Sequence, residues 1–487
     1  MKLSYKFYLA IFLLILNFNS SFFLYAQEAN NNDFEEVIDY SNLDLDDLEL
    51  ETRSNGGIDF NTLMQAVQKI EAPLWLITKP PRGRDALYLI PQRLNAIEYG
   101  GLVFNIFYNY TDDMAMRPNE IFNLEINQPA LEEFIKALNK SLTSQEASSV
   151  IPLFKNFTLQ ERKAGALIQG GFYSGPFIFQ LNTSLQFAER NFWLTQKEQN
   201  RLKSLFSETG DSLDTKEFYK TKFGMGDTRL KLGLNTLNMS NFQMDIGFEG
   251  IVPTSIISSI PRLQSYSINL ENFEDDLPTV LYSIRDNLIN PRIGNGGHFG
   301  LGCYMEAKVD LFHDAIQLWN RISFDNFFTA QEDRLILSAQ TIPPPAQDLA
   351  NFLNVISSSE GRTEFIKQYI FPPPYRVSVK PGSIINYVLN ATFEPGKNIG
   401  FGIGYDYYGQ QEEHIEKIYT ENIDPNTLRL SDAELINAQQ HKIFGEINYS
   451  KSQKNWKLVT ALGGDYTFSA KNMGNDWTIF IRIGGSF

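Results

Sequence analysis

The chain has few cysteines, few histidines and few long apolar stretches. Its 487 residues include one Cys and four His, so an internal disulfide and a cysteine-based metal site are excluded. The mean hydropathy is −0.25, and after the first apolar run no other reaches the roughly 20 residues of a membrane-spanning helix. A bundle of transmembrane helices is therefore excluded. The lone Cys303 falls on an apolar strand face, and we expect an inert, buried thiol there.

Basic residues are also in deficit. The formal net charge is −15, which argues against a nucleic-acid partner, because such partners are bound mainly through Lys and Arg. Ten acidic residues and no Lys or Arg lie between Glu28 and Glu51. This composition predicts an acidic, disordered periplasmic linker over 27–55. A tail that binds cations or a partner is the alternative, although the Gly turn and fixed spacing of a calcium loop are missing.

The N-terminus has the layout of a secretory signal peptide. Lys2 and Lys6 precede an apolar run over about 7–18, and a plausible cleavage point follows Ala26. A membrane anchor is the alternative, but about a dozen apolar residues are too few to span a bilayer. Residues 1–26 are therefore predicted to be removed. Residues 56–96 combine a short amphipathic helix with a Pro-Pro break, and they form either a plug or a small periplasmic element.

The last twelve residues alternate without a break. Their apolar positions fall on one face of a strand, namely Trp477, Ile479, Ile481, Ile483, Gly485 and Phe487. A terminal Phe preceded by this pattern resembles the assembly signal of bacterial outer-membrane β-barrel proteins, carried by Trp477, Ile479, Ile481, Ile483 and Phe487. The resemblance implies location in the outer membrane of a Gram-negative-type bacterium and contact with its lipids and barrel-assembly machinery. Ile481→Arg should then block assembly, whereas Arg482→Ile, on the lumen side, should be milder.

Twelve alternating segments predict an all-β membrane protein, an antiparallel transmembrane β-barrel over 97–487. They lie at about 97–110, 163–173, 176–188, 223–235, 241–251, 298–311, 314–326, 383–393, 397–408, 440–449, 454–468 and 476–487. Short and long connections alternate, which is typical of periplasmic turns and extracellular loops. Both chain ends then lie in the periplasm, and ten or fourteen strands are the alternatives.

Charges of both signs fall on the predicted lumen side of these strands. They are Asp227, Arg229, Lys231, Asp245, Glu249, Glu306, Lys308, Arg321, Asp325, Asp406, Lys442, Glu446, Lys457, Asp465 and Arg482. They either wet the lumen and join adjacent strands as ion pairs, or form a constriction that orients a polar solute. Glycines that alternate with Phe401 and Leu301 are expected to leave space inside the barrel.

Helical spacing appears in the long loops, at 129–142, 146–157, 347–356 and 362–371. Proline triplets at 343–345 and 372–374 bracket the second pair and should stiffen its flanks. The loops are therefore predicted to be partly helical. Their apolar residues must pack on other loops as a cap or fold into the lumen.

No catalytic or cofactor site is predicted. The four histidines, His298, His313, His414 and His441, are scattered at rims and turns, and they lack the spacing of metal ligands. No His stands beside a Ser as in barrel lipases. The run from Gly294 to Gly302 leads into a strand rather than a helix, so it is no phosphate loop. We expect no enzyme, metal or cofactor.

The favoured function is an outer-membrane channel or transporter for a small-molecule solute. The segment of about forty residues before the first strand and the apolar loops resemble the outer-membrane fatty-acid and hydrocarbon transport family, in which that segment would be a hatch. The alternative of another class is a non-transporting surface or structural barrel, such as an adhesin. A lumen sealed by ion pairs favours the structural barrel, and a continuous water path favours the channel.

Overall fold

The computed structural model describes residues 80–91, 100–112, 114, six single residues between 129 and 144, 159–192, 219–255, 286–312, 315–337, 372–395, 398–420, 423–453 and 456–486. The predicted signal peptide, the acidic linker, Phe487 and the loop helices over 146–157, 347–356 and 362–371 lie outside these residues. Of the predicted helix over 129–142, only a few single positions are described.

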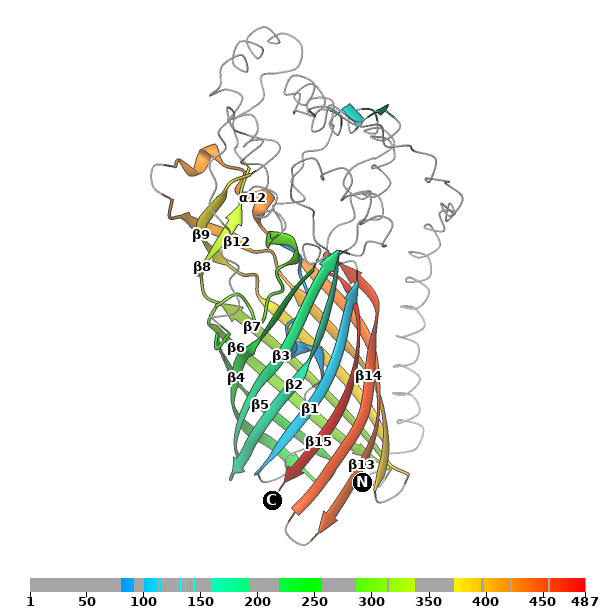
Figure 1. The fold of residues 1–487 in the computed structure, drawn as a ribbon. Coiled ribbons are helices and arrows are strands. Elements are labelled where there is room, and N and C mark those ends of the chain that lie inside the picture. Colours follow the sequence, from blue (N-terminus) through cyan, green and yellow to red (C-terminus); the bar gives the residue numbers. More distant parts are fainter. Residues whose placement is uncertain are drawn as a thin grey trace, which may run out of the picture. The chain divides into compact units, whose positions relative to one another are not determined.

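Twelve strands form a closed antiparallel barrel, as predicted (Figure 1). They are β1 (Gly100–Asp112), β2 (Leu159–Ser174), β3 (Phe177–Phe192), β4 (Tyr219–Met239), β5 (Phe242–Val252), β6 (Gly300–Leu311), β7 (Ile316–Phe327), β10 (Ile384–Phe393), β11 (Ile399–Gln410), β13 (Ala438–Gln453), β14 (Trp456–Lys471) and β15 (Asn475–Ser486). Closure joins the last strand to the first, with Gly101 opposite Ser486 and Asp112 opposite Asn475. Because every strand has two neighbours, the barrel leaves no unpaired edge.

The two faces of the barrel wall have opposite chemistry. Side chains that point outward are apolar and exposed, among them Phe104, Phe177, Phe248, Ile403 and Ile481. Side chains that point inward are polar and buried, among them Asn105, Gln180, Ser184, Asn390 and Thr478. This inverts the pattern of a protein in water, and it is stable where the outer face contacts lipid hydrocarbon. Cys303 is on the outward face and exposed, so the expectation of a buried thiol was wrong.

Aromatic side chains gather on the outer face near one end of the barrel. Trp477 lies 5.5 Å from Tyr108 and 5.9 Å from Tyr110, between ring centroids. Nearby strands add Tyr405, whose hydroxyl is 2.7 Å from Nδ1 of His441. Such a belt is typical of the interface between lipid tails and water.

Inward-facing glycines in the wall are covered by aromatic rings from the neighbouring strand. Tyr304 is opposite Gly247, Phe444 is opposite Gly404, and Phe480 is opposite Gly463. A Cβ added at Gly404 would lie 2.2 Å from the Phe444 ring, and one at Gly463 would lie 2.4 Å from the Phe480 ring. The glycines thus accommodate aromatic side chains. Of the three, only Gly404 alternates with Phe401, and the space expected at that position is occupied by the Phe444 ring.

Three further strands form a small separate sheet in the order β12 (His414–Ile418), β9 (Pro374–Lys380) and β8 (Ala330–Leu335). Val377, Val379 and Ile415 build its core together with residues near η7 (Pro425–Thr427) and α12 (Leu430–Ala433). β8 follows β7, and β9 precedes β10, so the sheet extends the barrel at the end opposite the C-terminal end of β15 (Figure 1). The sequence pattern predicted loops in this region.

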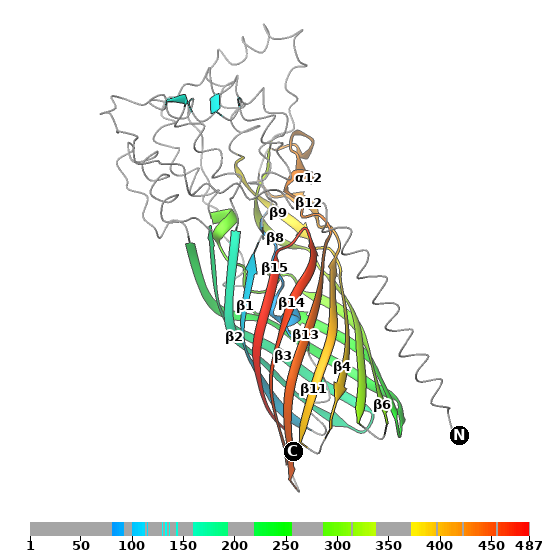
Figure 2. The same cartoon turned by 90° about the vertical axis from the view of Figure 1, so that its right-hand side faces the viewer.

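Residues 80–91, here called the inner segment, contain the short helix α3 (Ala86–Leu89). Asp85 caps this helix by accepting a hydrogen bond from the Leu87 amide at 2.8 Å. All four helical side chains are buried. Both views draw the inner segment, in blue, within the ring of barrel strands (Figure 2). No helix among the described residues has the length and apolar character needed to cross a membrane.

Candidate functional site

The predicted lumen charges are almost all inside the barrel. Except for Lys308 and Lys457, which are partly exposed, each is at most 8 % exposed. Charges buried this deeply are costly unless each is paired. The ion pairs between these charges lie in clusters on the inner wall.

One cluster is centred on Glu249 of β5. Its carboxylate lies 3.4 Å from Arg229 and 3.7 Å from Lys231, and it accepts a short hydrogen bond from Arg321. Arg321 also lies 3.7 Å from Glu306. The cluster joins β4, β5, β6 and β7 across the wall. Three cations thus approach the single carboxylate of Glu249, as expected for cross-strand ion pairs.

A second cluster is centred on Lys442 of β13. Its ammonium lies 3.0 Å from Asp465 and 2.8 Å from Asp476. Asp476 also accepts hydrogen bonds from Thr467 at 2.6 Å and Gln440 at 2.8 Å. Asp476 was missing from the predicted lumen residues, although its even position in β15 places it on the same face as Arg482.

The inner segment is bound to the wall through its polar side chains and carbonyls. Arg84 forms an ion pair with Asp406 at 2.7 Å, and the Tyr88 hydroxyl donates to Asp325 at 2.7 Å. The Arg229 guanidinium lies over the Tyr88 ring, 4.4 Å from its centroid. Lys163 donates to the Arg84 carbonyl at 2.9 Å. The predicted lumen charges on β4, β7 and β11 therefore serve partly to hold this segment.

The apolar side of α3 packs against the opposite wall. Ala86, Leu89 and Ile90 form a buried cluster with Phe107 of β1 and Phe480 of β15. Leu87 and Tyr88 contact another buried group, made of Leu167, Ile251, Phe327, Ile384, Tyr408, Ala438 and Met473. The segment thus lies inside the barrel with apolar contacts on several sides and with charged anchors on β7 and β11.

Arg482 has a larger structural role than its lumen position suggested. It forms an ion pair with Glu446 at 3.0 Å, and it donates to Asn105 at 2.9 Å and to the Pro91 carbonyl at 3.3 Å. Replacing it with Ile would remove the Arg482 partner of the buried Glu446, and breaking a buried ion pair costs about 3 to 5 kcal/mol. The expectation that Arg482→Ile is mild is therefore revised.

A third group of charges lies where the small sheet meets the barrel. Glu332 of β8 is within 2.9 Å of His298, 3.2 Å of Arg292 and 2.9 Å of Arg334. Arg334 also pairs with Glu413 at 3.0 Å. Burial alone would raise the pKa of Glu332, but Arg292, Arg334 and His298 hold it far below its ordinary value. Apart from His298, expected only at a rim, these residues were not predicted, because they come from loops and the small sheet.

The glycine-rich turn before β6 fits closely against this group. Gly294, Gly296 and Gly297 have φ values of +78°, +88° and +88°, which side chains rarely adopt. The Asn295 amide within the turn donates to Asp227 at 2.7 Å. A Cβ at Gly296 would lie 2.6 Å from Glu332. The turn that begins at Gly294 therefore packs closely against Asp227 and Glu332 at the mouth of the barrel.

Burial perturbs two titratable groups of the inner segment. It raises the pKa of Asp85, although the Leu87 amide and the nearby Lys163 act in the opposite direction. It also raises the pKa of the Tyr88 hydroxyl far above its ordinary value, despite Arg229 beside it. Tyr88 is therefore a neutral hydrogen-bond donor at neutral pH.

A cavity of about 110 Å³ separates the inner segment from the mouth of the barrel. It is lined by charged side chains of both signs, including Arg82, Glu161, Lys163, Asp227, Arg292 and Glu332. The volume holds several water molecules, and it is smaller than the ~300 Å³ at which pockets for drug-sized ligands begin.

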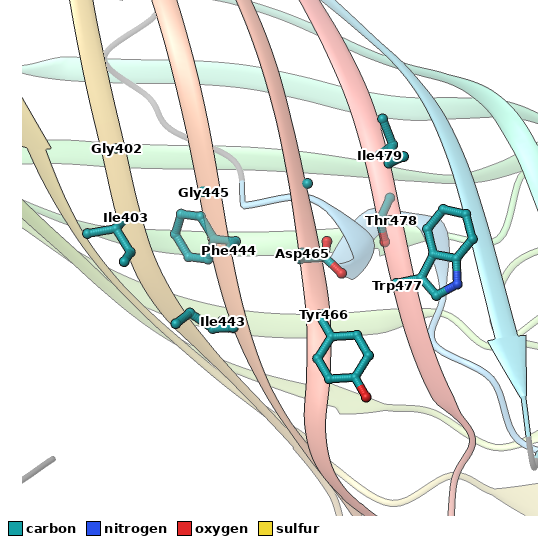
Figure 3. Close-up of a pocket in the computed structure, with 11 residues that line it drawn as sticks. Gly402, Ile403, Ile443, Phe444, Gly445, Asp465, Tyr466, Trp477, Thr478 and Ile479 are labelled. Carbon is teal, nitrogen blue, oxygen red and sulfur yellow. The ribbon is translucent and has the colours of Figure 1, made fainter. Parts of the chain in front are cut away.

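A larger hollow of about 460 Å³ opens on the outer wall instead of the lumen. It lies across β11, β13, β14 and β15, where Gly445 and Gly464 stand side by side. Ile403 and Ile443 flank it on one side, and Tyr466, Trp477 and Ile479 on the other (Figure 3). Because this face is the apolar one, the hollow faces the lipid side of the wall and is no part of a route through the barrel.

Among the described residues, no group of three or more His, Cys, Asp or Glu side chains is arranged to hold a metal ion. The charged clusters of the interior instead pair acids with Arg and Lys. These clusters join neighbouring strands and hold the inner segment.

A closed antiparallel barrel with an apolar exterior and a polar, filled interior defines an outer-membrane β-barrel protein. No protein-family model and no curated protein matches the chain. Solved structures with similar folds include an outer-membrane channel from Pseudomonas putida F1, at 9 % identity over 83 % of this chain and 99 % of that one, with a TM-score of 0.39. Others are the toluene transporter TbuX of Ralstonia pickettii (8 % identity, 88 % and 95 % covered, TM-score 0.34) and the KdgM porin (9 %, 78 % and 98 %, 0.24). Likenesses this distant concern the barrel fold alone.

Proposed function

We propose that this protein is a gated outer-membrane channel for small polar solutes, closed in this structure by the inner segment. The observation that carries the proposal is how that segment is held. Among the described residues, no backbone-to-backbone hydrogen bond joins it to a barrel strand, and its polar anchors use side chains, such as Arg84 to Asp406 and Tyr88 to Asp325. The segment can therefore leave without breaking the strand ladder that keeps the barrel closed.

The wall around the segment supports a polar solute over a hydrocarbon. If the segment left, it would uncover Asp406, Asp325, Arg229 and Lys163, all of them buried at present. Exposed to water, these charges form a hydrated path with acids and bases facing one another. The apolar surface uncovered with them lies at Phe107 and Phe480 and in the group that contains Leu167, Ile251 and Phe327. A hydrocarbon on that surface would still have to pass the uncovered charges. Fatty-acid-type transport through a hatch is therefore the less favoured form of the proposal.

Conductance of the purified protein in planar bilayers tests the proposal. Residues 80–91 are replaced by a Gly/Ser sequence of the same length, and heat-modifiable gel mobility confirms that the barrel is assembled. We expect rare openings in the native protein and a stable, larger conductance in the variant. An assembled variant that stays electrically silent would contradict the proposal.

The sealed interior also supports the alternative, a structural or surface barrel without transport. The ion pairs around Glu249 and Lys442 close the wall as a structural barrel requires, and the small sheet of β8, β9 and β12 would then be the functional part. This alternative predicts silence before and after replacement of the inner segment. Neither candidate includes a catalytic step. In both, we propose that the barrel-assembly machinery recognises the apolar face of β15.

A further inference from the structure

The mouth of the barrel contains a buried guanidinium that has no acidic partner within hydrogen-bond distance among the residues that the structure describes. Arg82 of the inner segment is 8 % exposed. Its Nη1 donates to the Ile436 carbonyl at 2.7 Å, whereas its Nη2 is buried and has no hydrogen-bond partner among the described residues. A buried, unsatisfied donor on a charged group carries a large desolvation cost. Such a group is normally satisfied by a partner.

Glu332 and Glu413, the two acids of this group, already pair with other cations. Glu332 contacts His298, Arg292 and Arg334. Glu413 pairs with Arg334 and accepts the Leu435 amide at 2.9 Å. In this group three guanidinium side chains, those of Arg82, Arg292 and Arg334, face two carboxylates. These five side chains therefore include one more guanidinium than carboxylate, although the cavity lining as a whole, which includes Asp85, Glu161 and Asp227, has as many acids as Arg and Lys side chains. The excess is local to Arg82.

Burial and neighbouring cations both lower the pKa of Arg82 and of Arg292, two of the arginines that line the cavity. Burial lowers the pKa of Arg82, and the positive charges of Arg334 and Arg292 lower it further, against the opposing effect of Glu413. Burial also lowers the pKa of Arg292, and Arg334 and Arg190 lower it further, against the opposing effects of Glu332 and Glu413. Both groups would be stabilised by an additional anion.

The space for that anion is present. Arg82 and Arg292 both line the cavity of about 110 Å³, which lies between the inner segment and the mouth. A planar guanidinium matches the two oxygens of a carboxylate, phosphate or sulfate. The small volume excludes a sugar or a long acid.

We propose that this cavity binds one small oxyanion, a carboxylate, phosphate or sulfate, through Nη2 of Arg82, with Arg292 as the second cationic wall. The ion is taken from solution, because a lipid phosphate brings a headgroup and acyl chains that the cavity cannot hold. Bound there, it adds a contact between the inner segment and the loop before β6, and so favours the closed form. Binding itself does not depend on whether the barrel conducts.

Isothermal titration calorimetry on the folded, full-length protein in detergent measures this binding. The probes are sodium phosphate, sulfate and acetate in a chloride buffer of constant ionic strength, and lipopolysaccharide forms a separate arm. We expect saturable 1:1 binding of at least one dissolved ion, a loss of at least tenfold in affinity for Arg82→Gln, and an intermediate loss for Arg82→Lys. Arg162→Gln, which alters an exposed arginine of the rim, should bind as the native protein does.

The site is refuted if no dissolved oxyanion saturates the native protein, if Arg82→Gln binds unchanged, or if only lipopolysaccharide binds. Arg82→Gln should fold, because it removes an unpaired buried charge. If it does not fold, thermal unfolding of the native protein and of Arg82→Lys gives an independent readout. Phosphate should then raise the midpoint of the native protein in a concentration-dependent way, and an unchanged midpoint would count against the site.

Discussion

Arg84→Met should open the channel, because Arg84 is the charged anchor of the inner segment. Its guanidinium pairs with Asp406 at 2.7 Å, and both side chains are almost fully buried. Without Arg84, Asp406 keeps the Asn386 amide as a donor at 2.9 Å, but its charge has lost its partner.

The size of the effect follows from the burial of the pair. Removing one partner of a buried ion pair costs about 3 to 5 kcal/mol, since the other charge stays desolvated. In the open form both groups are hydrated, and the substitution costs little. The equilibrium should therefore shift toward the open form by roughly 10²- to 10⁴-fold, at about 1.4 kcal/mol per factor of ten.

Single-channel recording in planar bilayers measures this shift as open probability. The double variant Arg84→Met with Asp406→Leu removes both charges, which is close to neutral for a buried pair, so it should return to the closed behaviour. Arg162→Met is the control, because its pair with Glu189 is long at 3.7 Å and exposed and contributes at most about 1 kcal/mol. Equal open probability in the native protein, the single variant and the double variant would refute the reasoning.

Three further predictions concern the wall and the mouth. Ile481→Arg places a charge on the lipid face at a cost of about 2 to 4 kcal/mol and should abolish the heat-modifiable folded band, whereas Ile481→Leu should keep it; equal yields would mean that the faces are misassigned. Gly463→Ala places a Cβ within 2.4 Å of the Phe480 ring and should lower the free energy of unfolding, measured in urea, by about 1 to 3 kcal/mol. Gly485→Ala is the control, because the space around Gly485 is open, and it should leave the free energy of unfolding unchanged. Folding lowers the pKa of Glu332, so its ion pairs stabilise the folded state at pH values above its ordinary pKa of 4.5, and this stabilisation is lost as the pH falls below that value. The native protein should therefore be more stable than Glu332→Gln by the full amount at pH 7 and by a smaller amount in acid. A stability difference that grows in acid would contradict the assignment.

The barrel could be predicted from the sequence because its constraint is local. A strand with lipid on one side and polar groups on the other alternates at every residue, so β15 was predicted at 476–487 and observed at Asn475–Ser486. The same alternation identified Arg229 and Glu249 as inward residues. It did not show which charges pair, because pairing depends on the register between strands.

The contents of the barrel could not be predicted in the same way. Arg84 and Asp406 are 322 residues apart in the chain, and nothing in the local pattern around 80–91 indicates the partner. The glycines that alternate with Phe401 suggested empty space, yet at Gly404 the ring of Phe444 occupies it. The small sheet was missed because β8 and β12 are only six and five residues long, and four successive polar residues in β8, at 331–334, hide the alternation that would indicate a strand.

The central claim is that the inner segment closes the barrel and can move. It is tested most directly by linking the segment to the wall reversibly, with Tyr88→Cys and Asp325→Cys in a Cys303→Ser background, where no other cysteine is present. The two positions are in contact in the native protein, through the hydrogen bond between Tyr88 and Asp325. With a short cleavable thiol crosslinker in place, bilayer recordings should show no conductance, and cleavage of the linker should produce openings within the same experiment. Identical currents before and after cleavage, with the linkage verified by mass spectrometry, would contradict the account.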